Sequence, residues 1–187
     1  MIDRLISWGI SLQRRRAGDN MADAMPFTSE EIKKLRELLQ IEEIRKVTLL
    51  YSQLLDGGEI DALAAIFVED ACCEFGPYGE WRGRETIREN YQKVFADEIK
   101  MKFGSMHITG NHWVELTSPA TAVGRSYLSD VLTHTDPTAQ PFEWFGLYDT
   151  AYEKVDGAWL IKRLSLQFFW PERHLTKGFP GPFPPNG

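Results

Sequence analysis

The sequence predicts an α+β fold, in which helices come first and an antiparallel sheet follows. Between residues 32 and 54, apolar residues recur every three or four positions, as on one face of an amphipathic helix. After residue 100 the pattern changes to four strand-like runs, at residues 103–117, 120–134, 142–155 and 158–170. Helices that precede a meander of strands are typical of the α+β class.

The first helix has clear start and stop signals. Thr28 and Glu31 have the spacing of a capping box, in which each side chain satisfies a backbone N–H of the other residue. Two glycines follow Asp56, and paired glycines commonly end a helix. We therefore expect one long helix that ends at Asp56 and a short second helix over residues 60–67.

The middle of the chain predicts a strand, a turn and a third helix. Residues 71–76 alternate weakly, as in a strand, and residues 76–79 have the composition of a turn. Helical spacing of apolar residues then extends over residues 84–99. In the later run 120–134, the even positions are mostly small, which would let a curved sheet pack closely around a helix or a ligand.

The length of 187 residues, 43% of them hydrophobic, indicates one globular domain, which we place at residues 25–172. Residues 1–24 are expected to be a poorly ordered extension, because Met21 and Met25 directly precede the first helix. Their mixture of charged and apolar residues does not have the order of a secretory signal. Residues 173–187 form a tail rich in proline and glycine, which is expected either to cover a pocket or to be disordered.

Charge and cysteine content exclude several classes of protein. The net charge of -6 would repel nucleic acid and anionic membrane surfaces, so neither is an expected partner. Cys72 and Cys73 are adjacent and do not suit a disulfide framework, which favours reduced thiols and a cytoplasmic location. No two histidines and a carboxylate have metal-ligand spacing, so we expect no metal site. The aromatic content of 12% suits a large apolar cavity or an aromatic core equally well.

Several short motifs in a fixed order carry a family likeness over roughly residues 30–170. They are Tyr51…Leu55-Asp56-Gly57, Trp81-Arg82-Gly83, Met106-His107…Asn111, Ala122-Val123-Gly124-Arg125…Tyr127 and Tyr148-Asp149…Tyr152. Together they resemble the SnoaL-like group of the nuclear-transport-factor-2-like superfamily. The resemblance implies a cone-shaped barrel, in which N-terminal helices close a strongly bent antiparallel sheet around one deep cavity.

Within this group the likeness is greatest to the bile acid 7α-dehydratases, with scytalone dehydratases and γ-hexachlorocyclohexane dehydrochlorinases more distant. The resemblance places a histidine base at His107, its carboxylate partner at Asp56, a pocket tyrosine at Tyr51 and a second acid at Asp130. The bile acid enzymes use an arginine on the last strand that has no counterpart in residues 166–170, which argues against a coenzyme A-linked or carboxylated substrate.

These residue types suit proton abstraction next to a carbonyl group. An imidazole titrates near neutral pH, and a carboxylate that accepts one ring N–H fixes the tautomer and aims the other nitrogen at the substrate. We expect this arrangement for His107 and Asp56, without a metal or an organic cofactor. The alternatives are a histidine that bonds a backbone carbonyl and an aspartate that satisfies N–H groups at the helix end.

Phenols and a second acid would complete the reaction. A hydroxyl from Tyr51, Tyr127 or Tyr148 would donate to the developing oxyanion, and Asp130 would protonate the departing hydroxyl or hold a water molecule. Asp130 could instead pair with an arginine or be solvated, and Tyr51 could be a core residue. The residues expected to contact the substrate are Phe75, Asn111, Trp113, Tyr127 and Tyr148.

Strand alternation raises one difficulty for His107. If the apolar residues near position 114 point inward, His107 points outward unless a bulge at Thr109-Gly110 reverses the alternation. We expect such a bulge, or else a cavity on the face that carries His107, Thr109, Asn111 and Trp113.

The sequence therefore predicts a cofactor-independent lyase, a dehydratase-like enzyme for a hydrophobic polycyclic or aromatic hydroxy-carbonyl compound such as a steroid or polyketide. An isomerase or cyclase on the same scaffold is the second reading, and a non-catalytic binding or assembly module is the third. Large residues on the outer sheet face, including Trp144 and Phe145, predict a homo-oligomer, either a dimer or a trimer.

Overall fold

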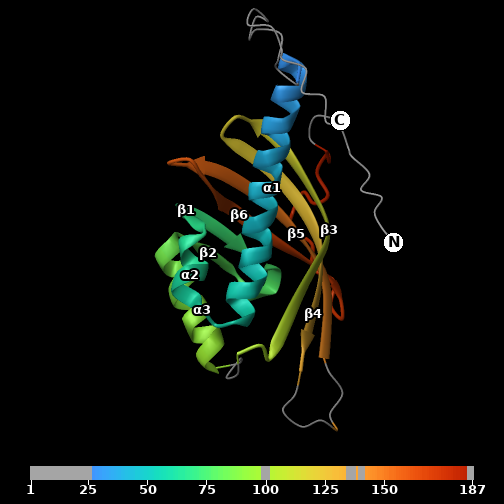
Figure 1. Ribbon diagram of the computed structural model, residues 1–187. Helices are drawn as coiled ribbons and strands as arrows, with labels where there is room; N and C mark the ends of the chain where they lie inside the picture. The colour runs from blue at the N-terminus through green and yellow to red at the C-terminus, as the bar shows by residue number, and fades with distance from the viewer. Residues whose placement is uncertain (1–26, 98–101, 134–137, 139–141, 185–187) are drawn as a thin grey trace, which may run out of the picture. The chain divides into compact units, whose positions relative to one another are not determined.

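The computed structural model describes residues 27–97, 102–133, 138 and 142–184 (Figure 1). The predicted extension 1–24 lies outside these residues. The chain divides into two compact units, Met1–Leu35 and Arg36–Gly187, and the second contains the whole sheet. The elements of the described chain are α1 (Ser29–Asp56), α2 (Ile60–Ala65), β1 (Phe67–Glu74), η2 (Gly76–Tyr78), β2 (Glu80–Arg82), α3 (Arg84–Asp97), β3 (Ser105–Ser118), β4 (Thr121–Leu132), β5 (Phe142–Val155) and β6 (Ala158–Trp170).

Both ends of α1 follow their predicted signals. The Thr28 N–H donates to Glu31 Oε2 at 2.7 Å, and the Glu31 N–H donates to Thr28 Oγ1 at 3.2 Å, which is a reciprocal capping box. At the other end Gly58 has a φ of +67°, and a Cβ there would lie 2.4 Å from the ring of Phe95. Glycine is therefore required at position 58, the second residue after the helix, both for its backbone conformation and for the close approach of α3.

The four long strands of the sheet confirm the predicted runs closely. β5 and β6 have the predicted bounds, and β3 and β4 differ from theirs by one or two residues at each end. The first strand begins four residues before its predicted start at residue 71, and the three-residue strand β2 was not predicted. The predicted turn at residues 76–79 contains the short 3-10 helix η2.

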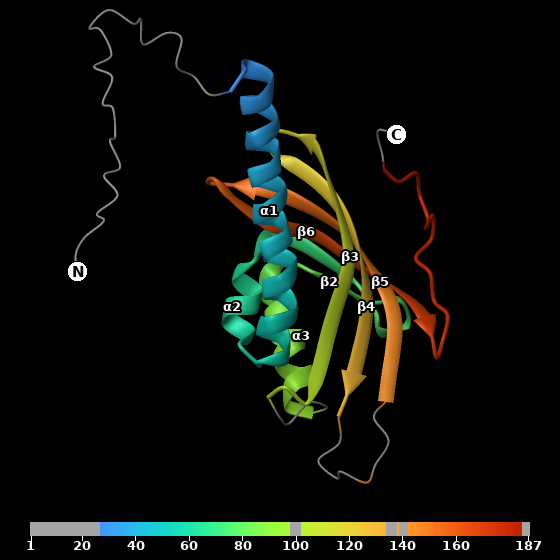
Figure 2. The same ribbon diagram turned by 45° about the vertical axis from the view of Figure 1, so that its right-hand side comes forward.

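The sheet is mixed and open, with the strand order β2-β1-β6-β5-β4-β3. The prediction of a purely antiparallel sheet is wrong at one place, because β1 pairs with β6 in parallel. β1 is not joined to β6 by a short hairpin, which would force the two strands to be antiparallel. It follows α2 in the chain, so the direction of β1 is set by that helix. β2 and β3 form the two edges, so the six described strands curve over the helices without closing into a barrel (Figures 1 and 2).

The core of the second unit lies between the concave face of the sheet and the helices. Ile44, Leu63, Phe67, Ile87 and Ile161 are at most 1% exposed. The even positions of β4 face this core, as predicted, and include Ala122 at 1% and Ser126 at 2% exposure. A Cβ on Gly124 would lie 3.0 Å from His112 Nε2, so a small residue is needed where the sheet closes over its neighbours.

A bulge in β3 resolves the expected difficulty over strand alternation. Gly110 pairs with Tyr127 and Trp113 pairs with Arg125, so the intervening two residues face one residue of β4. Asn111, in the bulge, has a φ of +50°. The bulge lies just beyond the predicted Thr109-Gly110. Because it reverses the alternation, His107 before it and Val114 after it both point to the concave face.

The described part of the tail packs on the convex face of the sheet, away from α1 (Figure 2). The Thr176 N–H donates to Gln167 Oε1 at 2.8 Å, and Gln167 Nε2 donates back to Thr176 Oγ1 at 3.1 Å. The guanidinium of Arg125 lies 4.2 Å from the ring centre of Phe183 and 5.0 Å from that of Phe179. Residues 171–184 are thus held to the sheet by specific contacts, and several of them line a hollow of about 260 Å³ beside Arg125. The tail therefore borders a pocket, as one of its two expectations states, but this pocket lies on the convex face.

Two further features bear on the predicted location. Cys72 and Cys73 are both unpaired, as expected. No helix among the described residues is both long enough and apolar enough to cross a bilayer.

Candidate active site

A cavity of about 600 Å³ lies between the concave face of the sheet and the helices α1 and α3. Its walls are mainly aromatic and aliphatic. The lining residues are Tyr51, Leu55, Phe75, Tyr78, Trp81, Tyr91, Val94, Ser105, His107, Leu128, Asp130, Leu132, Trp144, Phe145, Gly146, Tyr148, Leu166 and Phe168. His107 and Asp130 are the histidine and the carboxylate of this set, and the volume suits a small organic ligand.

His107 is held from behind by Asp56, as predicted. The ring Nδ1 lies 2.5 Å from Asp56 Oδ1, and the His107 backbone N–H donates to Asp56 Oδ2 at 3.0 Å. The side chains are 10% and 6% exposed, respectively. Asp56 does not line the cavity and lies on the Nδ1 side of the ring. Its carboxylate can therefore fix the ring tautomer while the opposite nitrogen, Nε2, points toward the cavity.

The position of Asp56 at the end of α1 explains this geometry. The Phe103 N–H donates to the Asp56 carbonyl at 2.6 Å, which joins the segment before β3 to the helix end. The N–H groups of Gly57 and Gly58 donate to backbone carbonyls of α1, at 3.0 Å each. Both carboxylate oxygens of Asp56 are therefore available to His107, and the reading of Asp56 as a local turn residue is not supported.

Asp130 lies on the other side of the imidazole. His107 and Asp130 are direct cross-strand partners in β3 and β4, which places both side chains on the concave face. Asp130 Oδ2 lies 3.7 Å from His107 Nε2, and Ser105 Oγ hydrogen-bonds to Asp130 Oδ1. Arg125 of β4 and Arg163 of β6 are the arginines that could have paired with Asp130, but they contact Asp149 instead, at 2.7 and 3.4 Å.

Three phenols form part of the cavity wall. The hydroxyls of Tyr51 on α1 and Tyr91 on α3 are 2.6 Å apart, and the ring of Tyr148 on β5 meets Tyr51 edge-on at 5.5 Å. Burial raises the pKa of all three hydroxyls well above the usual value for tyrosine. These groups therefore remain protonated near neutral pH and can donate hydrogen bonds into the cavity.

Comparison with known proteins identifies the family. Residues 36–165 match the SnoaL-like domain over most of the chain. The chain belongs to the SnoaL-like family. The fold and the predicted group are thereby confirmed at this level.

Three solved structures are similar to this SnoaL-like protein. A candidate scytalone dehydratase from Novosphingobium aromaticivorans has 24% identity and a TM-score of 0.64, over 76% of this chain and 95% of that one. An NTF2-like protein with a cystatin-like fold, from the same species, has 20% identity and a TM-score of 0.65, over 79% and 94%. A candidate calcium/calmodulin-dependent protein kinase II association domain from Xanthomonas campestris has 18% identity and a TM-score of 0.56, over 70% and 88%. At these identities the likeness shows the fold alone.

The structure brings some predicted substrate contacts of the SnoaL-like domain to the cavity and places others elsewhere. Phe75 and Tyr148 line the cavity. Tyr127 and Trp113 do not line it and are each 53% exposed, because both occupy positions that point to the convex face. Asn111 belongs to the bulge and is also absent from the lining. The prediction that these three residues line the pocket is therefore wrong.

Two predicted surface residues have different positions from those expected. Trp144 lines the cavity, and its ring packs against Phe168 at 5.7 Å. Phe145 lines the cavity too and is 41% exposed. A register shift in the pairing of β5 with β6 follows Phe145, so simple alternation does not place these side chains.

Sequence reasoning missed two polar residues of the site, Ser105 and Tyr91. Ser105 precedes His107 by two residues in the same strand, so strand periodicity could have placed it on the same face. Tyr91 was recognised only as an apolar position of the third helix. Its hydroxyl partner on α1 is distant in sequence, and no local pattern indicates that contact.

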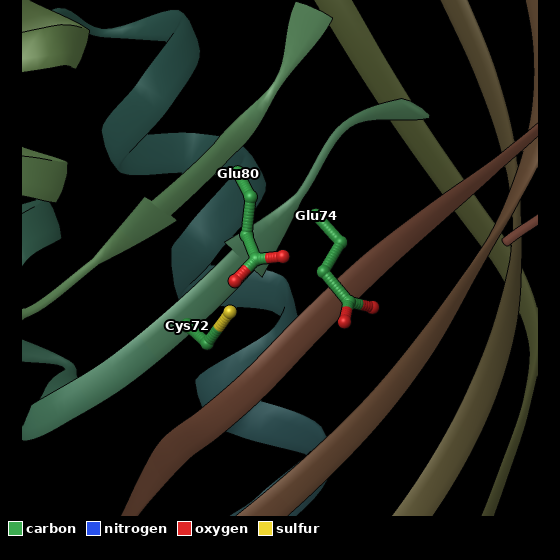
Figure 3. A group of neighbouring side chains, drawn as sticks. All are labelled: Cys72, Glu74 and Glu80. Carbon is green, nitrogen blue, oxygen red and sulfur yellow. The ribbon is translucent and has the colours of Figure 1, made fainter. Parts of the chain in front are cut away.

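A second group of side chains, Cys72, Glu74 and Glu80, lies on β1 and β2 (Figure 3). Their ligand atoms lie within 4.8 Å of one another, close enough to surround a metal ion. However, Glu74 Oε2 lies 2.6 Å from a guanidinium nitrogen of Arg163, and Glu80 pairs with Arg82. Burial also raises the pKa of the Cys72 thiol, which favours the neutral form. Both carboxylates are therefore already paired with arginines, and these ion pairs explain the cluster without a metal ion.

Proposed function

We propose that this SnoaL-like protein is a cofactor-independent lyase that eliminates water from a hydrophobic hydroxy-carbonyl compound. The observation that carries the proposal is the buried hydrogen bond between His107 and Asp56 beside a cavity of about 600 Å³. A histidine held in this way and facing vacant apolar volume is the arrangement required of a general base.

His107 would remove the proton. Asp56 accepts the hydrogen on Nδ1, so the lone pair of Nε2 faces the cavity and can take a proton from the carbon next to the carbonyl group. The imidazolium that forms is stabilised by the same carboxylate. As negative charge develops on the carbonyl oxygen, a buried phenol such as Tyr148 or Tyr51 donates to it in a medium where the bond is stronger than in water.

Asp130 would serve the departing hydroxyl. In its protonated form, Asp130 gives a proton to that hydroxyl as the carbon–oxygen bond breaks, and water leaves. The electrons of the carbon–hydrogen bond become the new double bond. The products of one turnover are a protonated His107 and an ionised Asp130, which lie 3.7 Å apart, so transfer of the proton between them restores the starting state.

The lining indicates a flat, uncharged substrate. Aromatic side chains from six elements form the walls, and the lining residues that the structure describes include no lysine or arginine to pair with a carboxylate or phosphate. A polycyclic or aromatic hydroxy-carbonyl compound, such as a steroid or polyketide, matches both properties. Within the family, the likeness to bile acid 7α-dehydratases supports the reaction type more than the substrate, since the arginine of the last strand is missing.

Two alternatives use the same scaffold. In an isomerase or cyclase, His107 would return the proton to another carbon and Asp130 would not need to act as an acid. A non-catalytic assembly module, as in the association domain named above, would not need a buried base beside vacant volume. The distance of 3.7 Å between Asp130 and His107 favours elimination, because it places an acid beside the base.

We also propose that the protein is a cytoplasmic homo-oligomer. Met106, Ile108, Tyr127 and Trp170 are each at least 42% exposed, and a self-associating surface would cover such residues. Sedimentation analysis of the full chain would distinguish a monomer, a dimer and a trimer.

The test of the proposed function is a substrate panel with matched variants. Hydroxylated ketosteroids and aromatic polyketides would be incubated with the protein, and the conjugated product would be followed by absorbance and by the mass loss of one water. We expect turnover by the wild type and by His174→Gln, which alters a partly exposed histidine that bonds Glu172 and does not line the cavity. We expect no turnover by His107→Gln. Elimination that survives in His107→Gln would refute the mechanism.

A further inference from the structure

Tyr78 is in an unusual position for a cavity residue. It lines the cavity, yet 57% of its surface is exposed. Most of the other aromatic lining residues are largely buried, including Phe75 at 8%, Tyr91 at 5% and Phe168 at 7%. A side chain that borders both the cavity and bulk solvent lies between them, so Tyr78 marks the opening of the cavity.

The ring of Tyr78 contacts two residues from the far side of the opening. Its centroid lies 6.4 Å from that of Trp144 at the start of β5 and 5.6 Å from that of Phe168 near the end of β6. Trp144 and Phe168 also contact each other, at 5.7 Å. We call these three residues the aromatic gate. Tyr78 is more than 60 residues away from the other two in the sequence. Each ring contact between them is weak on its own.

One side of the aromatic gate is held more loosely than the other. Tyr78 is the last residue of the three-residue helix η2, which begins at Gly76 and is followed by Gly79, and these two glycines have φ angles of +53° and +99°. Glycine at both ends lets the turn change conformation at little steric cost. Three backbone hydrogen bonds close this turn on itself, all between residues 75 and 79, and none of them joins it to β5 or β6. Phe168, in contrast, is part of strand β6 and also exchanges two backbone hydrogen bonds with His174, of 2.9 and 3.1 Å. Any movement that opens the cavity would therefore move Tyr78 and leave Phe168 in place.

We propose that the aromatic gate controls access to the cavity, with Tyr78 as its moving ring, and that it selects flat, uncharged ring systems. A planar apolar ligand can stack against each of the three rings as it passes, whereas an anionic ligand would lose hydration and meet the negative faces of the rings. Tyr78 is thus a specificity-determining residue that acts before chemistry. The inference depends on the cavity being a ligand site, as in the proposed function, but not on elimination.

The kinetics of ligand binding test this role directly. The neutral fluorescent probe N-phenyl-1-naphthylamine would be mixed with the full chain in a stopped-flow instrument, and the association and dissociation rate constants would be measured separately. A gate changes the barrier to passage and not the bound state, so Tyr78→Ala should raise both rate constants by about tenfold with a change of less than about threefold in Kd. A simple wall residue would change the dissociation rate alone.

Two further variants serve as controls. Val94→Ala shortens a lining side chain on α3, so it should raise the dissociation rate and leave the association rate unchanged. Gly79→Ala removes no ring, and its new Cβ would meet nothing within 4 Å, but a φ of +99° is strained for alanine. It should therefore displace the turn and raise the association rate, as Tyr78→Ala does. Circular dichroism and thermal melting would establish that each variant is folded.

An association rate constant that stays at the wild-type value in both Tyr78→Ala and Gly79→Ala would overturn the gate. Failure of the wild type to take up the probe would overturn it as well, since the cavity would then not accept a neutral aromatic compound. The probe is not turned over, so these measurements do not depend on the lyase reaction. Gated uptake in a protein that eliminates nothing would retain the gate and reject the proposed function.

Discussion

Both faces of the sheet place aspartate carboxylates beside basic side chains, but they arrange these groups differently. On the concave face, two aspartates flank one histidine, and the ring borders a cavity of about 600 Å³. On the convex face, Asp149 lies between Arg125 and Arg163, and the tail covers the group with aromatic rings. The comparison indicates that charge pairing alone does not identify an active site. What distinguishes the concave group is a histidine that is held by a carboxylate and that faces unfilled volume.

The largest effect should come from the histidine–carboxylate pair. Asp56→Asn keeps the size of the side chain but removes the carboxylate that orients the ring and stabilises the imidazolium. We expect a decrease in kcat of about 10²–10⁴-fold, comparable to that of His107→Gln, with KM little changed. Initial rates of product formation on the best substrate of the panel would measure it.

The convex face supplies the control for this variant. Asp149→Asn is the same substitution in a carboxylate that pairs with two arginines, so it should leave kcat within about twofold of the wild type. Equal losses in Asp56→Asn and Asp149→Asn would mean that general loss of structure, and not catalysis, explains both.

A smaller effect is expected at Asp130, and it separates elimination from isomerisation. Asp130→Asn cannot protonate a departing hydroxyl, so elimination should fall about 10²-fold, while His107 should still exchange the substrate proton with solvent. Product formation and deuterium uptake from heavy water would be measured on the same samples by mass spectrometry. If both rates fall together, Asp130 supports the base and does not act as the acid. If neither falls, the isomerase reading gains support.

Two histidines of β3 sharpen the comparison in a different way. His107 lies between two carboxylates, whereas burial and the charge of Arg45 lower the pKa of His112 from 6.5 to about 4. Between these pH values the unfolded chain binds a proton at His112 that the folded chain does not, so the free energy of unfolding decreases as the pH falls through this window. We expect a loss of about 2 kcal/mol between pH 7 and pH 5 from this residue.

Urea unfolding at the two pH values would measure this loss. His112→Gln cannot take up the proton, so it should show a smaller difference between pH 7 and pH 5 than the wild type. His174→Gln, which changes a partly exposed histidine paired with Glu172, should keep the wild-type difference. An identical pH dependence in His112→Gln and the wild type would show that other groups account for the acid sensitivity.

Much of this arrangement could be predicted from local patterns. The capping box, the glycines after Asp56 and the alternation of β5 and β6 fixed the ends of these elements, because each signal acts within a few residues. Alternation along β4 also places Tyr127 and Asp130 on opposite faces of the sheet, so this pattern alone predicts that Tyr127 does not share the cavity with Asp130. The pairing of His107 with Asp56 was expected from the family resemblance, and not from spacing.

The remaining features depend on contacts between distant residues. The parallel pairing of β1 with β6 joins segments almost 100 residues apart, and no local signal records it. The bulge lies at residues 111 and 112, two residues beyond the predicted pair, and its presence places Trp113 opposite Arg125 and so on the convex side. Ser105 and Tyr91 are polar residues whose partners are set by the tertiary structure, so a pattern of apolar spacing describes them only as strand and helix positions.

The smallest effect should appear on the convex face, at the contact between Arg125 and the tail. Arg125→Ala removes the pair with Asp149 and two cation–π contacts, with Phe179 and Phe183. The side chain is only 16% exposed, so we expect a decrease of about 1–2 kcal/mol in the free energy of unfolding and faster proteolysis of the tail. Arg125→Lys should recover only part of this loss, because an ammonium group cannot stack between two rings as a guanidinium does. Activity should stay at the wild-type level in both variants, since the tail lies on the face opposite His107. A decrease in kcat that parallels the loss of the tail contacts would show that the two faces are coupled, and the distinction between a chemical face and a structural face would then fail.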